Sequence, residues 1–223
     1  MKYNCVLFDL DGTLLNSKEG VWRSFEYALE KLGYPNPKIE DIEPLIGPPI
    51  ERVFVENYGY SVEDGWRGHD FYQEEYVTHG RMYKDPFFDG AKETIDALVA
   101  MGCTVGVCTN KGESTARQII GKSPLAIPLD HVYGPDDAGT RTNKVEIIQA
   151  FLRDYGYDTP EKRSKVLMVG DRYYDIEGAA AAGIDGAGVA FGNGTREELL
   201  GAGAVAVVDQ MMTLTDIVAG KNK

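Results

Sequence analysis

The sequence predicts an α/β protein in which helices flank a parallel sheet and a helical segment is inserted near the start. From about Phe87 onward, short apolar runs rich in β-branched residues alternate with segments whose apolar residues recur at helical spacing. Such alternation is typical of a parallel sheet covered by helices. The stretch from about Ser17 to Lys84 differs, because it shows helical spacing and no convincing strand.

The first predicted strand is the apolar run Cys5-Val6-Leu7-Phe8, and acidic residues follow it directly in Asp9-Leu10-Asp11-Gly12-Thr13. Gly12 can bend the chain after the two carboxylates, because glycine tolerates backbone conformations that other residues avoid. Both acids would then lie at the carboxyl end of a strand, where open α/β sheets bind their ligands. Asp-Gly is also common turn chemistry, so this segment alone leaves a turn or a helix cap as the alternative.

Three helices are predicted in the inserted segment, each from apolar and aromatic residues that recur at helical spacing. Their defining positions are Val21, Phe25, Ala28, Leu29 and Leu32 for the first helix, Ile50, Val53, Phe54 and Asn57-Tyr58 for the second, and Phe71, Tyr72, Glu75, Tyr76 and His79 for the third. Gly33 ends the first of these runs.

The remainder of the chain predicts the alternating part of the fold. The predicted helices are Ala91–Met101, Ser114–Ile120, Lys144–Tyr155 and Ile176–Ala182. The predicted strands are Thr104–Cys108, Val132–Tyr133, Lys165–Val169, Gly188–Phe191 and Ala204–Val208. We expect these strands to join the first one in a single parallel sheet.

A second acidic cluster follows the strand Lys165–Val169, in the segment Gly170-Asp171-Arg172-Tyr173-Tyr174-Asp175. If this strand and the first one are neighbours, Asp9, Asp11, Asp171 and Asp175 converge on one small volume. Like charges that close raise one another's pKa unless a cation neutralises them. Oxygen ligands without paired His or Cys favour a hard ion, and Mg²⁺ binds one or two carboxylates together with water and phosphate. The sequence therefore predicts a magnesium site that receives a phosphate.

Two further segments offer groups that would bind an anion. Thr109-Asn110-Lys111 follows the strand Thr104–Cys108 and supplies a hydroxyl, an amide and main-chain N–H groups. Lys144 opens a predicted helix, and both a lysine and a helix N-terminus attract anionic oxygens. Each has a structural alternative, because Thr109 could cap a helix and Lys144 could lie on the solvated surface.

The order of these motifs resembles the haloacid dehalogenase superfamily of phosphohydrolases over essentially the whole chain. Within it the chain is similar to phosphoglycolate phosphatase-like and 5'-nucleotidase-like members, to which Gly47-Pro48-Pro49 and the segment from Phe191 to Glu198 contribute. The resemblance implies a Rossmann-like catalytic core of residues 1–16 and 85–223. It also implies an α-helical cap domain of residues 17–84 that closes over the substrate; an ordinary helical layer without motion is the alternative.

The resemblance also implies a role for each motif residue. Asp9 would attack phosphorus and form an aspartyl-phosphate, and Asp11 would serve first as general acid and then as general base. Thr109 and the N–H of Asn110 would hold the phosphoryl oxygens. Lys144 would offset the charge of the nucleophile and the phosphoryl group.

Metal and substrate ligands follow from the same resemblance. The expected Mg²⁺ ligands are Asp9, the main-chain carbonyl of Asp11, and Asp171, with Asp175 supporting them. The candidate substrate-binding residues are Thr13, Lys111, Arg52 and Arg23. For the two arginines, a solvated helix face is the alternative.

The composition of the chain limits the kinds of partner that it is expected to bind. A formal net charge of −12 and a pI near 4.7 argue against binding a nucleic acid polymer through surface charge. Three cysteines, an odd number, suit core packing in a reduced compartment better than a disulfide framework. No apolar run approaches membrane-spanning length, and the first residues leave no room for a signal peptide. We therefore expect a cytoplasmic protein without membrane partners, a monomer or weak homodimer that acts on a small phosphate ester.

The leading interpretation is a Mg²⁺-dependent phosphatase that hydrolyses a small phosphate monoester such as phosphoglycolate or a nucleoside monophosphate. A pyrophosphatase or a phosphosugar mutase resembling β-phosphoglucomutase is the alternative, and Thr13 weighs against the mutase because relatives of that type commonly carry an apolar residue there. A dehalogenase would need neither Asp11 nor a metal. A non-catalytic binding module is a further alternative, against which the complete set of motif residues argues.

Overall fold

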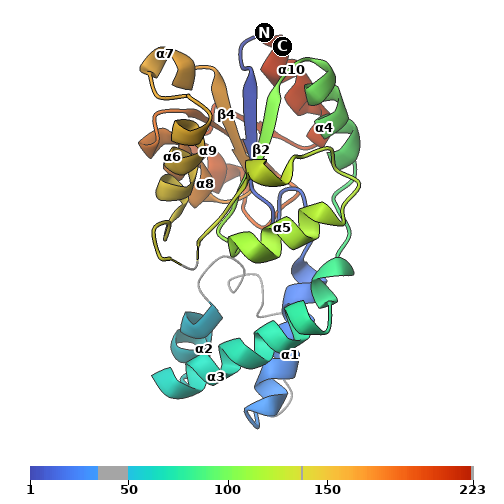
Figure 1. The fold of residues 1–223 in the computed structure, drawn as a ribbon, viewed down its shortest axis with the longest axis vertical. Coiled ribbons are helices and arrows are strands. Elements are labelled where there is room, and N and C mark those ends of the chain that lie inside the picture. Colours follow the sequence, from blue (N-terminus) through green and yellow to red (C-terminus); the bar gives the residue numbers. More distant parts are fainter. Residues whose placement is uncertain (35–49, 137, 222–223) are drawn as a thin grey trace. The chain divides into compact units, whose positions relative to one another are not determined.

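The computed structural model describes residues 1–34, 50–136 and 138–221 of the chain. The chain divides into two compact units (Figure 1). We call Met1–Leu15 together with Phe87–Lys223 the core unit, and Asn16–Pro86 the inserted unit. Among the described residues, no helix combines the length and the apolarity that a membrane crossing requires.

The core unit is built on a six-stranded sheet in which every strand pair is parallel and the strand order is β3-β2-β1-β4-β5-β6. The strands are β1 Cys5–Phe8, β2 Thr104–Cys108, β3 Val132–Tyr133, β4 Val166–Gly170, β5 Asp185–Val189 and β6 Ala206–Val208. Strand order reverses at β1, since the chain runs from β1 outward to β3 on one side and returns to β4 on the other. A Rossmann-like α/β fold is therefore confirmed for this unit.

Helices cover the sheet as predicted. They are α4 Ala91–Ala100, α5 Glu113–Gly121, α6 Lys144–Asp154, α7 Pro160–Arg163, α8 Tyr173–Ala181, α9 Arg196–Gly201 and α10 Leu214–Ala219, with 3₁₀ turns at Leu129–His131 and Met211–Thr213. Helix α8 packs against α6 and α9, and α4 packs against α10 (Figure 1). Because these helices shield the sheet, all residues of β1 and β4 are buried, which explains their uninterrupted apolar sequence.

The register of the three central strands brings their carboxyl ends level. Phe8, the last residue of β1, pairs with Val107 on β2 and with Val169 on β4. The segments that follow these strands therefore leave the sheet at the same edge, beside the point where strand order reverses. That edge is where open α/β sheets bind ligands.

Strand β5 was predicted three residues too late, at Gly188–Phe191, whereas it covers Asp185–Val189. Its glycines weaken the sequence signal, but close helix packing requires them. A Cβ on Gly186 would lie 3.1 Å from the Cα of Ile176 on α8, and one on Gly188 would lie 2.8 Å from the side chain of Leu199 on α9. Helix α8 also begins three residues earlier than predicted, at Tyr173, and the short helices α7, α9 and α10 were not predicted.

The secondary structure of the inserted unit, in its described residues, consists of helices and helical turns. It contains α1 Lys18–Lys31, α2 Ile50–Tyr58, α3 Val62–Gln73, a π turn at Glu74–Thr78 and a 3₁₀ turn at Arg81–Tyr83. The third helix begins at Val62 rather than near Phe71, where the prediction put it, because the Ser61 hydroxyl caps it by accepting from the Asp64 N–H. Gly47-Pro48-Pro49 lies outside the described residues.

Aromatic side chains form the core of the inserted unit. The buried ring of Phe25 on α1 lies with its centroid 5.3 Å from that of Phe54 on α2 and 5.1 Å from that of Tyr72 on α3. Gly68 makes this approach possible, since a Cβ there would lie 2.7 Å from the Phe54 ring. Three helices therefore share one aromatic cluster, although each is short.

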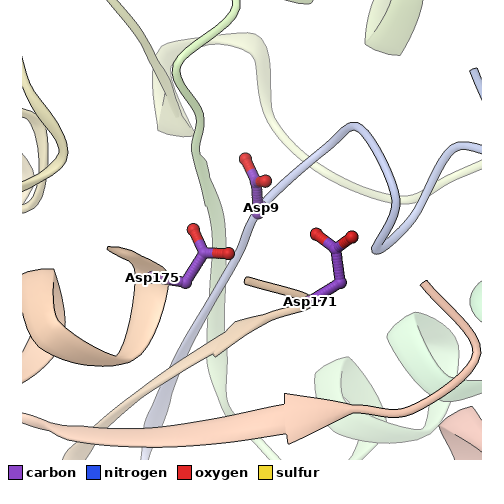
Figure 2. A group of neighbouring side chains, drawn as sticks. All are labelled: Asp9, Asp171 and Asp175. Carbon is purple, nitrogen blue, oxygen red and sulfur yellow. The ribbon is translucent and has the colours of Figure 1, made fainter. Parts of the chain in front are cut away.

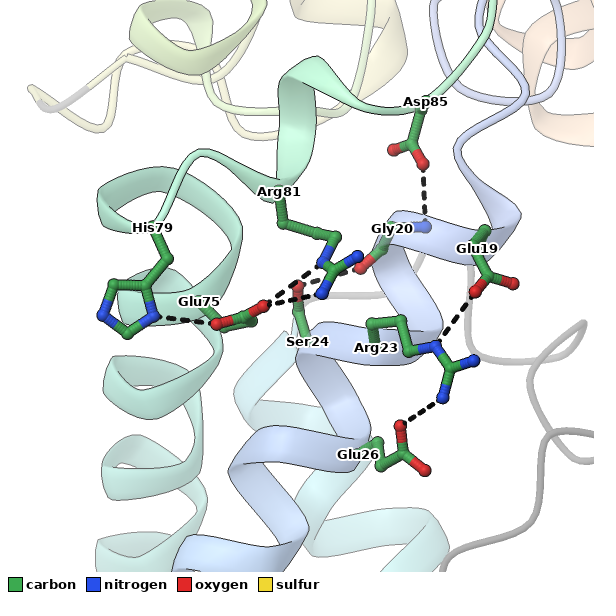
Figure 3. A network of polar contacts seen from close by, with 9 residues as sticks. All are labelled: Glu19, Gly20, Arg23, Ser24, Glu26, Glu75, His79, Arg81 and Asp85. Atoms are coloured by element: carbon green, nitrogen blue, oxygen red, sulfur yellow. Dashed lines mark hydrogen bonds and ion pairs between the residues drawn. The ribbon is translucent and has the colours of Figure 1, made fainter.

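The two ends of the inserted unit are tied to each other (Figure 3). The buried Asp85 carboxylate accepts a 2.8 Å hydrogen bond from the Gly20 N–H in the first turn of α1, and the Asn16 N–H donates to the Pro86 carbonyl at 2.9 Å. A carboxylate at a helix N-terminus satisfies a free N–H and interacts favourably with the helix dipole. Entry and exit of the unit are thus held side by side.

Phe25→Ala tests the aromatic cluster of the inserted unit. We expect it to lower the free energy of unfolding by about 3 to 5 kcal/mol, because it leaves a cavity among buried rings. Urea unfolding followed by circular dichroism measures this change. The matched control is Trp66→Ala on α3, whose side chain is exposed, and its effect should stay within about 0.5 kcal/mol. Equal effects of the two variants would contradict this account of the core.

Candidate active site

Three buried aspartates meet at the carboxyl edge of the sheet (Figure 2). Asp9 directly follows β1, Asp171 directly follows β4, and Asp175 lies in the first turn of α8. One carboxylate oxygen of each lies within 4.8 Å of those of the other two. We call these three residues the acidic cluster. The sequence predicted a fourth member, Asp11, whose carboxylate does not belong to this group and pairs with Lys111.

Glycines allow the chain to pass close to these carboxylates. Gly12 adopts φ = 81°, and a Cβ there would lie 2.2 Å from Asp171 Oδ2. A Cβ on Gly170 would lie 2.3 Å from the Asp175 side chain. Asp175 Oδ2 in turn accepts from the Arg172 N–H at 3.1 Å, which closes the first turn of α8. Local backbone geometry therefore fixes where the acids point.

Lys144, the first residue of α6, brings an ammonium that pairs with the acidic cluster. Its Nζ lies 3.0 Å from Asp9 Oδ1 and 2.8 Å from Asp175 Oδ1, and it donates to the Cys108 carbonyl at 2.9 Å. Lys144 is only 4% exposed, so the alternative of a solvated surface lysine is wrong. Burial alone would lower the pKa of Lys144, but Asp175 and Asp9 raise it, and the side chain stays charged.

Burial and mutual repulsion dominate the electrostatics of the acids. Burial raises the pKa of Asp9 to about 6, Asp175 and Asp11 add to the increase, and Lys144 opposes it. Burial together with the charges of Asp175 and Asp9 raises the pKa of Asp171 to about 8, and the Asn193 N–H and Arg172 only partly oppose this increase. Lys144 thus pairs with two of three buried carboxylates, an arrangement that favours a further positive charge.

The donor set fits a hard cation. The cluster offers only oxygen atoms, and no His or Cys belongs to it. Oxygen ligands of this kind suit Mg²⁺, Ca²⁺ or Mn²⁺, and a divalent ion would relieve the repulsion that raises the pKa of Asp171. The cluster could therefore hold a metal ion.

Asp11 and Thr13, which follow the nucleophile candidate in the sequence, also reach this edge. Asp11 Oδ2 lies 3.1 Å from Lys111 Nζ, and the Thr13 hydroxyl donates to Asp171 Oδ1 at 3.3 Å. Thr13 is fully buried, so the structure places it as a partner of Asp171. Its predicted contact with substrate remains a prediction.

The segment after β2 forms a tight turn that contains Thr109, Asn110 and Lys111. The Thr109 hydroxyl accepts from the Lys111 N–H at 3.2 Å, and the Thr109 side chain is buried. Helix α5 begins later, with Gly112 as its N-cap, so Thr109 does not cap a helix. Asn110 is half-buried beside it. Their predicted contacts with phosphoryl oxygens remain predictions.

The two arginine candidates lie in the inserted unit and are not part of the acidic cluster. Arg23 donates to Glu19 at 2.9 Å and to Glu26 at 2.8 Å on its own helix, so two carboxylates already balance its charge (Figure 3). Arg52 is exposed on α2. These contacts and exposures are typical of solvated helix faces, and a role in substrate binding stays a prediction for both.

Sequence reasoning missed two residues that hold this site together. The Asn193 N–H donates to Asp171 Oδ2 at 2.7 Å, and the ring of Tyr174 lies 5.9 Å from Lys144 Nζ. Asn193 belongs to the segment from Phe191 to Glu198, which carries part of the family resemblance, but a main-chain donor leaves no signal in the residue type. Tyr174 lies within the Gly170–Asp175 motif and could have been noted there.

Comparison with known proteins establishes the family. The model of haloacid dehalogenase-like hydrolases matches residues 6–189. A 5'-nucleotidase of Pseudomonas aeruginosa is 36% identical over 199 residues, which are 89% of this chain and 88% of that protein. A phosphoglycolate phosphatase of Rhodospirillum rubrum is 30% identical, covering 95% and 89%. The tyrosine-protein kinase PtkA of Mycobacterium tuberculosis is 32% identical, covering 95% of this chain and 70% of its own length.

A solved structure agrees with these matches. The crystal structure of a predicted phosphatase from Clostridium acetobutylicum superposes with a TM-score of 0.86 at 30% identity, covering 99% of this chain and all of the other. The chain belongs to the haloacid dehalogenase-like hydrolase family. The predicted class of enzyme, a phosphoric monoester hydrolase, is thereby confirmed, whereas the substrate is not identified.

Asp171→Asn tests the charge balance of the acidic cluster. An amide can still accept from the Asn193 N–H, and it removes the repulsion that raises the pKa of Asp171. We therefore expect the metal-free variant to be at least as stable as wild type. Adding MgCl₂ should stabilise wild type, by about 2.7 kcal/mol at one hundred times Kd, and should barely affect the variant.

Thermal unfolding with and without MgCl₂ and EDTA measures both effects. Asp130→Asn, at an exposed aspartate of the same unit, is the matched control and should respond to Mg²⁺ as wild type does. An equal Mg²⁺ response in Asp171→Asn would show that the ion binds elsewhere.

Proposed function

We propose that the protein is a Mg²⁺-dependent phosphatase that hydrolyses a small phosphate monoester through an aspartyl-phosphate on Asp9. The single observation that carries this proposal is the buried Asp9 carboxylate, held 3.0 Å from the ammonium of Lys144 within a cluster of further acids. A purely structural role would pair these charges more evenly. An excess of buried carboxylates at a ligand-binding edge is instead typical of a site that uses a cation.

Asp9 is the proposed nucleophile. One carboxylate oxygen forms a bond to phosphorus while the bond from phosphorus to the leaving oxygen breaks. Lys144 keeps Asp9 oriented and offsets negative charge on the nucleophile and on the phosphoryl group, which is what phosphoryl transfer requires most. Mg²⁺ held by Asp9, Asp171 and the main-chain carbonyl of Asp11, with Asp175 beside them, would supply positive charge to the phosphoryl oxygens.

Asp11 is the proposed general acid and base. It gives a proton to the leaving oxygen in the first step and takes one from the attacking water in the second, so that its protonation state is restored in each cycle. Thr109 and the N–H of Asn110 are the proposed donors to the phosphoryl oxygens. Thr109 directly follows β2, just as Asp9 directly follows the neighbouring strand β1, and this supports the assignment.

The proposed substrates are small monoesters such as 2-phosphoglycolate or a nucleoside monophosphate. The names of two relatives, a phosphoglycolate phosphatase and a 5'-nucleotidase, support this class. Water is the proposed acceptor of the phosphoryl group. Because one relative is named a tyrosine-protein kinase, transfer of the phosphoryl group to another hydroxyl should also be tested. The inserted unit, whose residues nearly coincide with the predicted cap, is the proposed source of selectivity.

Asp9→Asn tests the assigned nucleophile. The amide is nearly isosteric but hardly nucleophilic, so turnover should fall by about three orders of magnitude or more while the fold persists. Phosphate release and circular dichroism measure the two effects, and Asp130→Asn serves as the control. Beryllium fluoride with MgCl₂ should raise the unfolding temperature of wild type and leave that of Asp9→Asn unchanged. Near-normal phosphate release by Asp9→Asn would overturn the assignment.

A panel of phosphate compounds tests the substrate class. We expect Mg²⁺-dependent phosphate release from 2-phosphoglycolate or nucleoside monophosphates, with kcat/KM higher than for inorganic pyrophosphate, and no release after EDTA treatment. The assay includes a hexose 1-phosphate followed for conversion to its 6-phosphate, which a mutase would produce. Turnover that survives EDTA, or a preference for pyrophosphate, would contradict this part of the proposal.

A further inference from the structure

The ion pair between Lys111 and Asp11 is largely buried. Lys111 Nζ lies 3.1 Å from Asp11 Oδ2, and the two side chains are 9% and 17% exposed. A lysine this far from water is costly to hold unless an opposite charge meets it, and breaking a buried pair is far more costly than breaking a surface one. The pair therefore fixes the orientation of the Asp11 carboxyl group.

The two oxygens of Asp11 have different surroundings. Oδ2 faces the ammonium of Lys111, whereas Oδ1 is buried and has no hydrogen-bond partner among the residues that the structure describes. An ammonium carries three donors and no acceptor. The ammonium therefore engages Oδ2, and Oδ1 is the oxygen left available to meet a reacting group.

We propose that Lys111 is a positioning residue that reserves Asp11 Oδ1 for proton transfer. This inference rests on the proposed function. In the first step, the Oδ1 proton passes to the bridging ester oxygen as the bond from that oxygen to phosphorus breaks. In the second step, water bonds to phosphorus, the bond between Asp9 and phosphorus breaks, and a water proton returns to Oδ1. Oδ2 stays paired with Lys111 throughout.

The backbone that carries Lys111 supports this role. The Lys111 N–H donates to the Thr109 hydroxyl at 3.2 Å, which folds the segment after β2 into a tight turn. The same turn thus bears the proposed phosphate ligand Thr109 and the lysine that orients Asp11. A shift of the turn would displace Thr109 and Lys111 together. The Asp11 carboxyl group therefore keeps its position relative to the proposed phosphoryl site.

Two substitutions at Lys111 test the proposal. Lys111→Met keeps the length of the side chain and removes its donors, so we expect kcat to fall by about tenfold or more, because a misoriented general acid and base loses much of its contribution. KM should stay within about twofold, and Lys111→Arg, which restores donors, should recover most of the lost kcat. A higher KM with unchanged kcat would show that Lys111 binds substrate directly and would overturn the proposal.

A double-mutant cycle separates positioning from a structural role. Once Asp11→Asn has removed the group that Lys111 positions, adding Lys111→Met should change the residual kcat by less than about twofold. A further loss as large as in wild type would overturn the proposal. Lys111→Gln is the second variant if Lys111→Met lowers thermal stability, and the same fall in kcat is expected for it.

Control variants distinguish failure of this inference from failure of the proposed function. Lys92→Met removes an exposed lysine that pairs with Asp96 on α4, and it should match wild type. If wild type turns over, Asp9→Asn does not, and Lys111→Met equals wild type, this inference alone is wrong. If wild type releases phosphate from no ester, the proposed function fails and the inference fails with it.

Discussion

The interaction on which the structure of the site depends is the sharing of one buried ammonium among several carboxylates. Lys144 pairs with Asp9 and Asp175 at 3.0 and 2.8 Å, far from solvent, and neither of these ion pairs includes Asp171. Such an arrangement is costly in a low-dielectric interior, because unpaired buried charge is destabilising. The surrounding fold offsets this destabilisation, since β1 and β4 are wholly buried and paired with each other.

This constraint explains where the chain places its glycines and main-chain donors. Gly12 and Gly170 lie so close to Asp171 and Asp175 that any side chain would displace a carboxylate. Main-chain N–H groups of Arg172 and Asn193 donate to Asp175 and Asp171. Neutral donors lower the energy of a carboxylate without cancelling its charge. The acids are therefore held in place and still available to a cation.

The sequence predicts the structure correctly where chemically distinctive residues directly follow a clear apolar strand pattern. The motif acids could be predicted to converge because each follows an apolar strand, and parallel strands bring their carboxyl ends to one edge. Strand β5 escaped correct prediction because its glycines serve helix packing by Ile176 and Leu199, contacts that no local pattern encodes. The pairing of Lys111 with Asp11 was missed for another reason: a long side chain has many rotamers, and only the folded turn selects the one that reaches the carboxylate.

In the proposed mechanism, the acidic cluster and Asp11 recognise only what phosphate esters have in common, because they act on the phosphoryl group and the leaving oxygen. Discrimination between substrates must therefore come from residues that meet the rest of the molecule. The inserted unit is suited to carry them, since it has its own aromatic core around Phe25 and ties its two ends together through Asp85. Its surface can change without disturbing the buried charges of the core unit. Under the proposed function, electrostatics at the sheet edge would constrain the chemistry, whereas the residues that determine selectivity could vary on the helix faces of the inserted unit.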